Sequence, residues 1–133
     1  MINKITIKEI LKISEKYPNN IIIETKNILS CKGNIFYISE NILVVVGKLL
    51  NNTYMVHQVL EQLKENPSNK IVIWNNSEVF TEQGQLALRE LLQQHEQIKF
   101  IFITHDMNKI ADGIKLRCFQ YVHWIYKFWI VKE

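Results

Sequence analysis

The chain has 133 residues, of which 47% are hydrophobic and 22% charged, and its formal net charge is +3. This length and composition predict one globular domain over residues 1–133 and exclude a disordered chain. A positive charge this small neither indicates nor excludes a nucleic-acid partner.

The cysteines and the first residues bear on the cellular compartment. Cys31 and Cys118 are far apart, with no CxxC spacing and no nearby pair of histidines, so we expect reduced thiols and no metal site. The start, "MINKITIKEILKIS", contains several lysines and lacks the continuous apolar stretch of a signal peptide. No apolar window of about 18 residues is present. These features predict a soluble, cytoplasmic protein with no membrane contact.

Hydrophobic spacing and turn residues predict an alternation of helices and strands. The helices are expected over 4–17, 53–66, 81–94 (capped by Thr81) and near 107–113. The strands are expected over 20–26, 34–39, 70–74, 99–104 and 118–124. The run "ILVVVGKLL" (42–50) fits either a strand or a buried helix. Strands that alternate with helices predict an α/β fold in three layers, with a mostly parallel sheet between helices.

In such a sheet, functional residues gather at the carboxyl ends of the strands. The polar residues expected at these ends are Asn75, Asn76, Ser77 and Glu78 after "IVIW", and Thr104, His105 and Asp106 after "FIFI". A further charged residue, Arg117, comes just before the last strand in "IKLRC".

Residues 70–124 resemble the second half of the ATPase core of clamp-loader subunits, which are AAA+ proteins. The family includes the delta-prime and gamma/tau subunits of bacterial DNA polymerase III and the small subunits of replication factor C. Its members have a strand ending in a Walker B motif, a helix of the form NALLKxLE, a strand of the form KFLL-A/I-T, and SRC. This chain has "IVIWNNSE", "QLALRELLQ", "KFIFITHDMNKI" and "IKLRC" in that order, without a gap from Lys99 to Cys118.

The resemblance implies a P-loop NTPase core that has lost its catalytic chemistry. Asn75 and Asn76 stand where the family's Asp and Glu bind magnesium and polarise the attacking water, and with Glu78 they form a degenerate Walker B site. An amide carries no charge and cannot act as a base. The phosphate-loop pattern GxxxxGK[ST] is missing, because the one Gly-Lys pair, Gly47-Lys48, is followed by leucine. We therefore expect neither enzyme activity nor a bound cofactor or metal.

Two further positions keep some family character. Thr104 or His105 stands at the sensor-1 strand end. Arg117 matches the SRC arginine, which reaches a neighbouring subunit's ATP as an arginine finger, although Leu116 replaces the serine before it. The resemblance also implies that the chain ends where the family's helical lid domain would begin.

Simpler interpretations of these residues remain open. Asn75 and Asn76 would serve equally as turn residues at the end of a buried strand. Arg117 taken alone is typical of a surface or ion-pair arginine. The aromatic tail, with Trp124, Phe128 and Trp129, either completes the core or forms a docking patch.

The sequence thus predicts a non-catalytic, delta-prime-like subunit that acts in DNA replication by contacting other clamp-loader or replication subunits in a hetero-oligomer, with any DNA contact indirect. The alternative is a pseudo-ATPase remnant that is a structural or interaction component of a different assembly. A nucleic-acid-binding module is a weaker third hypothesis, because no dense stripe of Lys and Arg is present.

Overall fold

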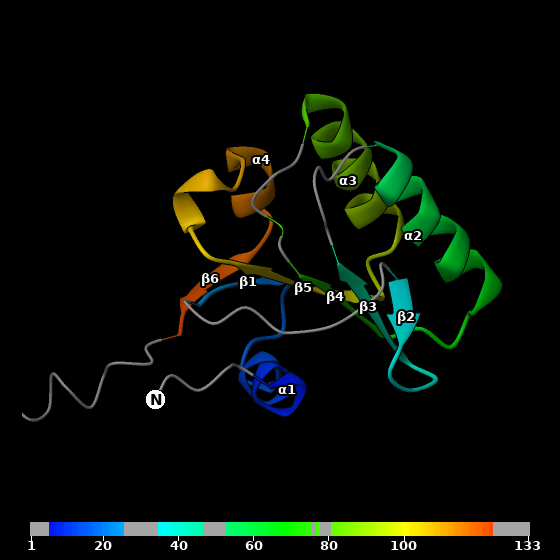
Figure 1. The fold of residues 1–133 in the computed structure, drawn as a ribbon, viewed down its shortest axis with the longest axis horizontal. Helices are drawn as coiled ribbons and strands as arrows, with labels where there is room; N and C mark the ends of the chain where they lie inside the picture. Colours follow the sequence, from blue (N-terminus) through cyan, green and yellow to red (C-terminus); the bar gives the residue numbers. More distant parts are fainter. Residues whose placement is uncertain (1–5, 26–34, 47–52, 76, 78–80, 124–133) are drawn as a thin grey trace, which may run out of the picture.

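In the computed structural model, a six-stranded sheet in the order β2-β3-β4-β5-β1-β6 separates helices on its two faces (Figure 1). The structure describes residues 6–25, 35–46, 53–75, 77 and 81–123. The strands are β1 (Ile21–Glu24), β2 (Ile35–Tyr37), β3 (Ile42–Val46), β4 (Ile71–Asn75), β5 (Lys99–Thr104) and β6 (Phe119–Val122). The helices are α1 (Ile7–Glu15), α2 (Thr53–Glu65), α3 (Glu82–Gln94), the short 3-10 helix η1 (Met107–Lys109) and α4 (Asp112–Lys115).

Five neighbouring strands, β3, β4, β5, β1 and β6, run parallel, and β2 is antiparallel to β3 at one edge. Helix α1 covers one face, which we call the α1 face, and α2, α3 and α4 cover the other, the α3 face (Figure 1). The predicted three-layer α/β fold with a mostly parallel sheet is confirmed, and the arrangement fits a P-loop NTPase-like core.

The two hydrophobic cores follow from side-chain alternation along the strands. In β5, Phe100 and Phe102 join the core of the α3 face, whereas Ile101 and Ile103 join the core of the α1 face. Both faces are covered, so the strand is a continuous apolar run and its four central side chains are fully buried. Leu88 and Leu91 of α3, together with Val56 and Val59 of α2, pack in the core of the α3 face.

From the sequence, Ile71, Ile73, Phe100, Phe102 and Val122 are expected to be buried in the parallel sheet, and two of these five positions are wrong. Ile73, Phe100 and Phe102 are fully buried as expected, but Ile71 is half-buried and Val122 is 44% exposed. Ile71 is the first residue of β4, where the sheet meets solvent. Val122 lies on β6, which pairs with β1 on one side and is the last strand in the sheet order. An edge strand buries less than a central one.

The helix boundaries have local causes. A capping box starts α1, because the Thr6 side chain accepts a hydrogen bond from the Glu9 N–H while Glu9 bonds back to Thr6. The predicted cap of α3 is confirmed, since the Thr81 side chain accepts from the Gly84 N–H.

Two uncertain segments of the sequence are resolved by the fold. In the ambiguous run 42–50, Ile42–Val46 forms β3, parallel to β4, and 47–50 lie outside the described residues. The single helix expected near 107–113 is two short ones, because Ile110 between them is extended (φ −81, ψ 135) with its side chain buried. None of the helices within the described ranges has the length and apolar character needed to cross a membrane.

Candidate functional site

All five parallel strands end at one edge of the sheet, which we call the carboxyl edge. Asn75 is the last residue of β4 and Thr104 the last of β5. These strands are neighbours, so the fold brings two of the predicted site residues to the same place. Asn76 and Glu78 lie outside the described residues.

Asn75 and Thr104 nevertheless belong to opposite faces of the sheet. Asn75 is two residues beyond Ile73, whose side chain is in the core of the α1 face. Thr104 is two residues beyond Phe102, in the core of the α3 face. Strand alternation therefore directs the two side chains to opposite faces, and both residues are buried, at 1% and 0% exposure. They are not arranged to bind one ligand together.

The sensor-1-like position has a structural role in its own loop. The Thr104 hydroxyl accepts a hydrogen bond from the Asp106 N–H (3.1 Å) and contacts the Asp106 carbonyl (3.2 Å). The Asp106 carboxylate in turn accepts from the Asn108 N–H (3.0 Å) at the start of η1. These contacts fix the turn after β5, while the His105 side chain is exposed. The Thr104 hydroxyl is thus engaged in holding the turn.

Other polar groups at the carboxyl edge are also engaged internally. The Ser77 hydroxyl and N–H both donate to the Ile103 carbonyl, each at 3.0 Å, which ties the chain after β4 to β5. The Glu24 carboxylate, at the end of β1, accepts from the Met107 N–H at 2.6 Å. These bonds hold the chain after β4 and the turn before η1 against the ends of β5 and β1.

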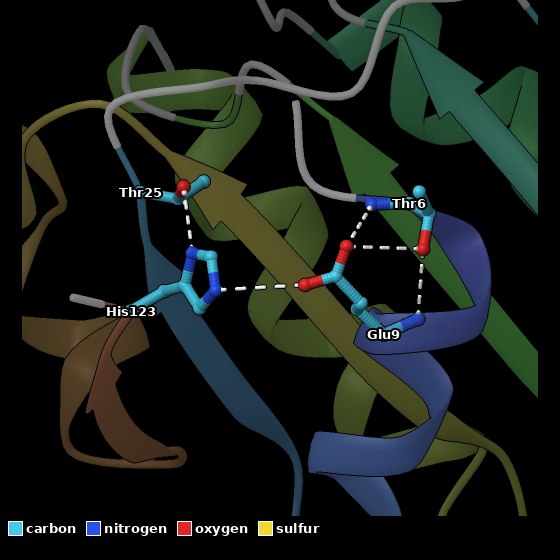
Figure 2. Close-up of polar contacts among 4 residues, drawn as sticks. All are labelled: Thr6, Glu9, Thr25 and His123. Carbon is cyan, nitrogen blue, oxygen red and sulfur yellow. Dashed lines mark hydrogen bonds and ion pairs between the residues drawn. The ribbon is translucent and has the colours of Figure 1, made fainter. Parts of the chain in front are cut away.

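A second polar cluster at this edge lies on the α1 face (Figure 2). The His123 ring, just after β6, lies between Thr25 and Glu9: its Nδ1 is 3.2 Å from the Thr25 hydroxyl and its Nε2 is 3.7 Å from a Glu9 carboxylate oxygen. Glu9 also completes the capping box with Thr6 (Figure 2). The cluster joins the start of α1 to the ends of β1 and β6. Thr25 is 1% exposed, so a substrate has no access to its hydroxyl.

Arg117 is at the opposite edge, the amino edge, because it precedes β6. It is half-buried, and its Nη1 donates to the Gly113 carbonyl of α4 at 2.9 Å. It lines a cavity of about 410 Å³, the amino-edge pocket, with residues 18–20, the end of α3, residues 96–98 and Lys99. Among the described residues, no carboxylate forms an ion pair with Arg117.

The amino edge favours cations. Helices α1, α3 and α4 each lead into a strand at this edge, so their carboxyl ends, which carry partial negative charge, are gathered there. The Lys99 ammonium donates to the carbonyls of Ser14 and Tyr17 at the end of α1. Burial lowers the pKa of Lys99 below its ordinary value of 10.5.

Cys118, next to Arg117, is half-buried. Burial raises the pKa of its thiol to about 12, and the nearby Arg117 charge offsets this only in part. The other cysteine, Cys31, lies outside the described residues, as do Trp124, Phe128 and Trp129 of the aromatic tail.

Comparison with known proteins relates part of the chain to a clamp-loader protein. A stretch of 53 residues, 39% of the chain, is 40% identical to a protein of Acanthamoeba polyphaga mimivirus named "Putative replication factor C small subunit". The matched part spans only 15% of that protein's length. Comparison with protein-family profiles finds no match. This partial similarity suggests a clamp-loader-like relationship for a stretch of 53 residues and does not extend it to the whole chain.

Two features of the site were beyond reach of sequence reasoning. The cluster of Thr25, His123 and Glu9 joins segments 98 residues apart, and no motif marks these three residues. The amino-edge pocket likewise combines residues before β1, after α3 and before β6. One signal was present: His123 lies near the end of the strand expected over 118–124, where polar residues of neighbouring strands are expected to meet.

Proposed function

We propose that this protein is a non-catalytic, clamp-loader-like subunit that acts in DNA replication by contacting partner proteins. The similarity to a replication factor C small subunit over 53 residues supports membership of a clamp-loader assembly, and the α/β fold is compatible with such a subunit. Partners would be other clamp-loader or replication subunits in a hetero-oligomer, and any DNA contact would be made through them.

The proposal that the protein is non-catalytic rests on the residues present at the carboxyl edge. A P-loop enzyme needs a loop of backbone N–H groups and a lysine for the phosphates, and carboxylates for magnesium. The sequence lacks the loop, and an amide occupies the Asn75 position. The described hydroxyls and carboxylates nearby are used in loop contacts, such as Thr104 with Asp106 and Glu24 with Met107.

The position of Arg117 supports a role in trans. The carboxyl edge lies the length of β5 away, about 20 Å for six residues, which an arginine side chain does not span. An anion that meets the guanidinium therefore comes from outside this chain's own strand ends. As part of the proposal, Arg117 supplies positive charge to a neighbouring subunit's ATP site, where it stabilises the charge of phosphoryl transfer.

The second candidate is a pseudo-ATPase remnant in a different assembly. The bond from Arg117 to the Gly113 carbonyl favours it, because this bond gives the arginine a role in closing α4. Under this hypothesis the fold provides binding surfaces, and Arg117 affects no partner's rate.

Purification of the tagged protein from its native cells tests the assembly. Recovery of clamp-loader subunits is the expected result, and recovery of a different, stable set of proteins would favour the remnant. Calorimetric titration of the isolated protein with ATP and magnesium should show no binding, so micromolar affinity would refute the non-catalytic proposal. In the recovered complex, Arg117→Ala should slow ATP turnover, whereas Arg89→Ala, an exposed arginine of α3, should leave it unchanged.

A further inference from the structure

Strand β6 is the last strand in the sheet order, and among the described residues no strand pairs with its outer side (Figure 1). The N–H groups of Phe119 and His123 donate to carbonyls of the β1 segment, at 2.7 and 2.8 Å. Because the direction of the backbone groups alternates along a strand, the N–H and C=O groups of Gln120 and Val122 point away from β1. These four groups are available to pair with another strand.

β6 also lacks the features that usually keep edge strands apart. Proline and charged side chains are the common protection, and the four residues of β6, "FQYV", include neither. Apolar side chains are exposed on both faces: Phe119 is 41% exposed on the α1 face, and Val122 is 44% exposed on the α3 face. Pairing with another strand would cover both.

Helix α1 runs alongside β6 in the opposite direction. Near its start, a Glu9 carboxylate oxygen is 3.7 Å from the His123 Nε2, and just after its end the Tyr17 ring stacks on Phe119 with centroids 4.1 Å apart. The rise of α1 from residue 9 to 17 is about 12 Å, and that of β6 from 119 to 123 is about 13 Å, so the two elements stay in step.

A second copy of the chain satisfies the β6 edge in one register. If two copies pair antiparallel about a two-fold axis at Tyr121, Gln120 of each lies opposite Val122 of the other, and all outward backbone groups of both strands are bonded. An axis at Gln120 would need the Cys118 N–H, which already donates to the Lys115 carbonyl at 3.2 Å. In the Tyr121 register the two tyrosines face each other, and like charges are nowhere opposite.

The same axis brings unlike charges on the two α1 helices to the same level. Glu9 and Lys16 are two helical turns apart, so they share the side of α1 that lies beside β6. The axis exchanges the level of His123 with that of Phe119, and Glu9 of one copy therefore meets the level of Lys16 of the other, twice in the dimer. Both side chains are exposed, and the Glu9 carboxylate keeps acceptor capacity beyond its bonds to Thr6 and His123. This charge complementarity favours a second copy as the occupant of the edge.

We propose that two copies of this chain associate through their β6 edges into a two-fold dimer with one continuous sheet, centred on Tyr121 and flanked by two pairs of Glu9 with Lys16. The inference goes beyond the proposed function and does not depend on it, because it concerns copies of this chain alone.

Sedimentation velocity of the full chain over about 1–200 µM tests the dimer. A shift from monomer to dimer is expected, with a dissociation constant in the micromolar range because the interface is small. Val122→Pro removes an outward N–H that takes no part in the pairing with β1, and this variant should stay monomeric. Lys16→Glu should weaken the dimer about tenfold, whereas Lys64→Glu, the same charge change in the last turn of α2, should leave it unchanged.

Disulfide cross-linking tests the register. In a background of Cys31→Ser and Cys118→Ser, Tyr121→Cys should give a covalent dimer on oxidation by copper phenanthroline, because the Cα atoms of a directly opposite, non-hydrogen-bonded pair are about 4.5 Å apart. Gln120→Cys is the matched control, since that position meets Val122 of the other copy and should cross-link far less.

A monomer at every concentration, a dimer that Val122→Pro leaves intact, equal losses in Lys16→Glu and Lys64→Glu, or equal cross-linking at Gln120 and Tyr121 would each overturn the proposal. If Val122→Pro does not fold, the charge change and the cross-link still decide. None of these measurements uses ATP or a replication subunit, so their outcome is distinguishable from that of the proposed function.

Discussion

Replacement of Asn75 by aspartate returns the residue that the clamp-loader family has at this position, and we expect it to destabilise the protein. Asn75 is 1% exposed at the end of β4, one residue beyond the fully buried pair of Trp74 and Phe102. A carboxylate there would lose its water without the magnesium and lysine that accompany it in an ATPase. Burial raises the pKa of such a carboxyl. A rise of about two units corresponds to a loss of about 2.7 kcal/mol at neutral pH.

The sign of the pH dependence distinguishes this cause from a packing defect. With a folded-state pKa above the unfolded value of about 3.9, the penalty is complete at neutral pH and is relieved as pH falls through the raised pKa. Urea unfolding of Asn75→Asp and the native protein at about pH 5 and pH 7 measures this difference. The control is Asn41→Asp at an exposed position, which should change stability by less than about 0.5 kcal/mol. A loss at Asn75→Asp that is as small as the control's, or independent of pH, would refute the reasoning.

Three further predictions concern the core, the polar cluster and the thiol. Phe100→Ala should cost about 3–5 kcal/mol in urea unfolding, because the ring is fully buried, and Phe100→Leu should cost less and remain folded. Thr25→Val and His123→Phe should each cost about 1 kcal/mol, and a double-mutant cycle should show that the two losses do not add. In a Cys31→Ser background, iodoacetamide should modify Cys118 far more slowly in the native protein than in urea. The Cys118 contribution to stability should also fall between pH 9.0, its ordinary pKa, and about pH 12, since the unfolded thiol loses its proton first.

The sequence predicted the elements well where the signal is local. The Thr81 hydroxyl caps α3 by accepting a hydrogen bond from the N–H three residues later, and the sequence alone reveals this spacing. Pro67 comes two residues after the end of α2, as expected because proline is disfavoured inside a helix. The alternation of apolar runs with amphipathic segments was enough to predict the parallel sheet. The separation of η1 from α4 at Ile110 was not predicted, because it depends on the packing of the Ile110 side chain in the core of the α3 face.

Sheet order explains most of the remaining errors. Val122 has the same apolar character as the residues of β5, and only the edge position of β6 leaves it exposed. For the site, the expectation that functional residues gather at the carboxyl ends of strands correctly predicted that Asn75 and Thr104 lie at one edge of the sheet. This expectation did not predict that the two side chains point to opposite faces of the sheet. The face depends on the register between β4 and β5 and on the residue at which each strand ends. Arg117 was correctly expected before the last strand, but its bond to Gly113 was not.

The place of β1 in the sheet has a consequence for how the chain acquires its structure during synthesis. β1 is made early, yet both of its neighbours, β5 and β6, come from the last third of the sequence. The bonds that hold it join residues 80 apart, from Asn20 to Phe100, and 98 apart, from Thr25 to His123. Closing loops of this length is slow compared with joining β3, α2, β4, α3 and β5, which follow one another along the chain. On the ribosome, the isoleucines of α1 and β1 therefore stay exposed until β5 has emerged. During this interval the nascent chain is most prone to aggregate and to bind chaperones.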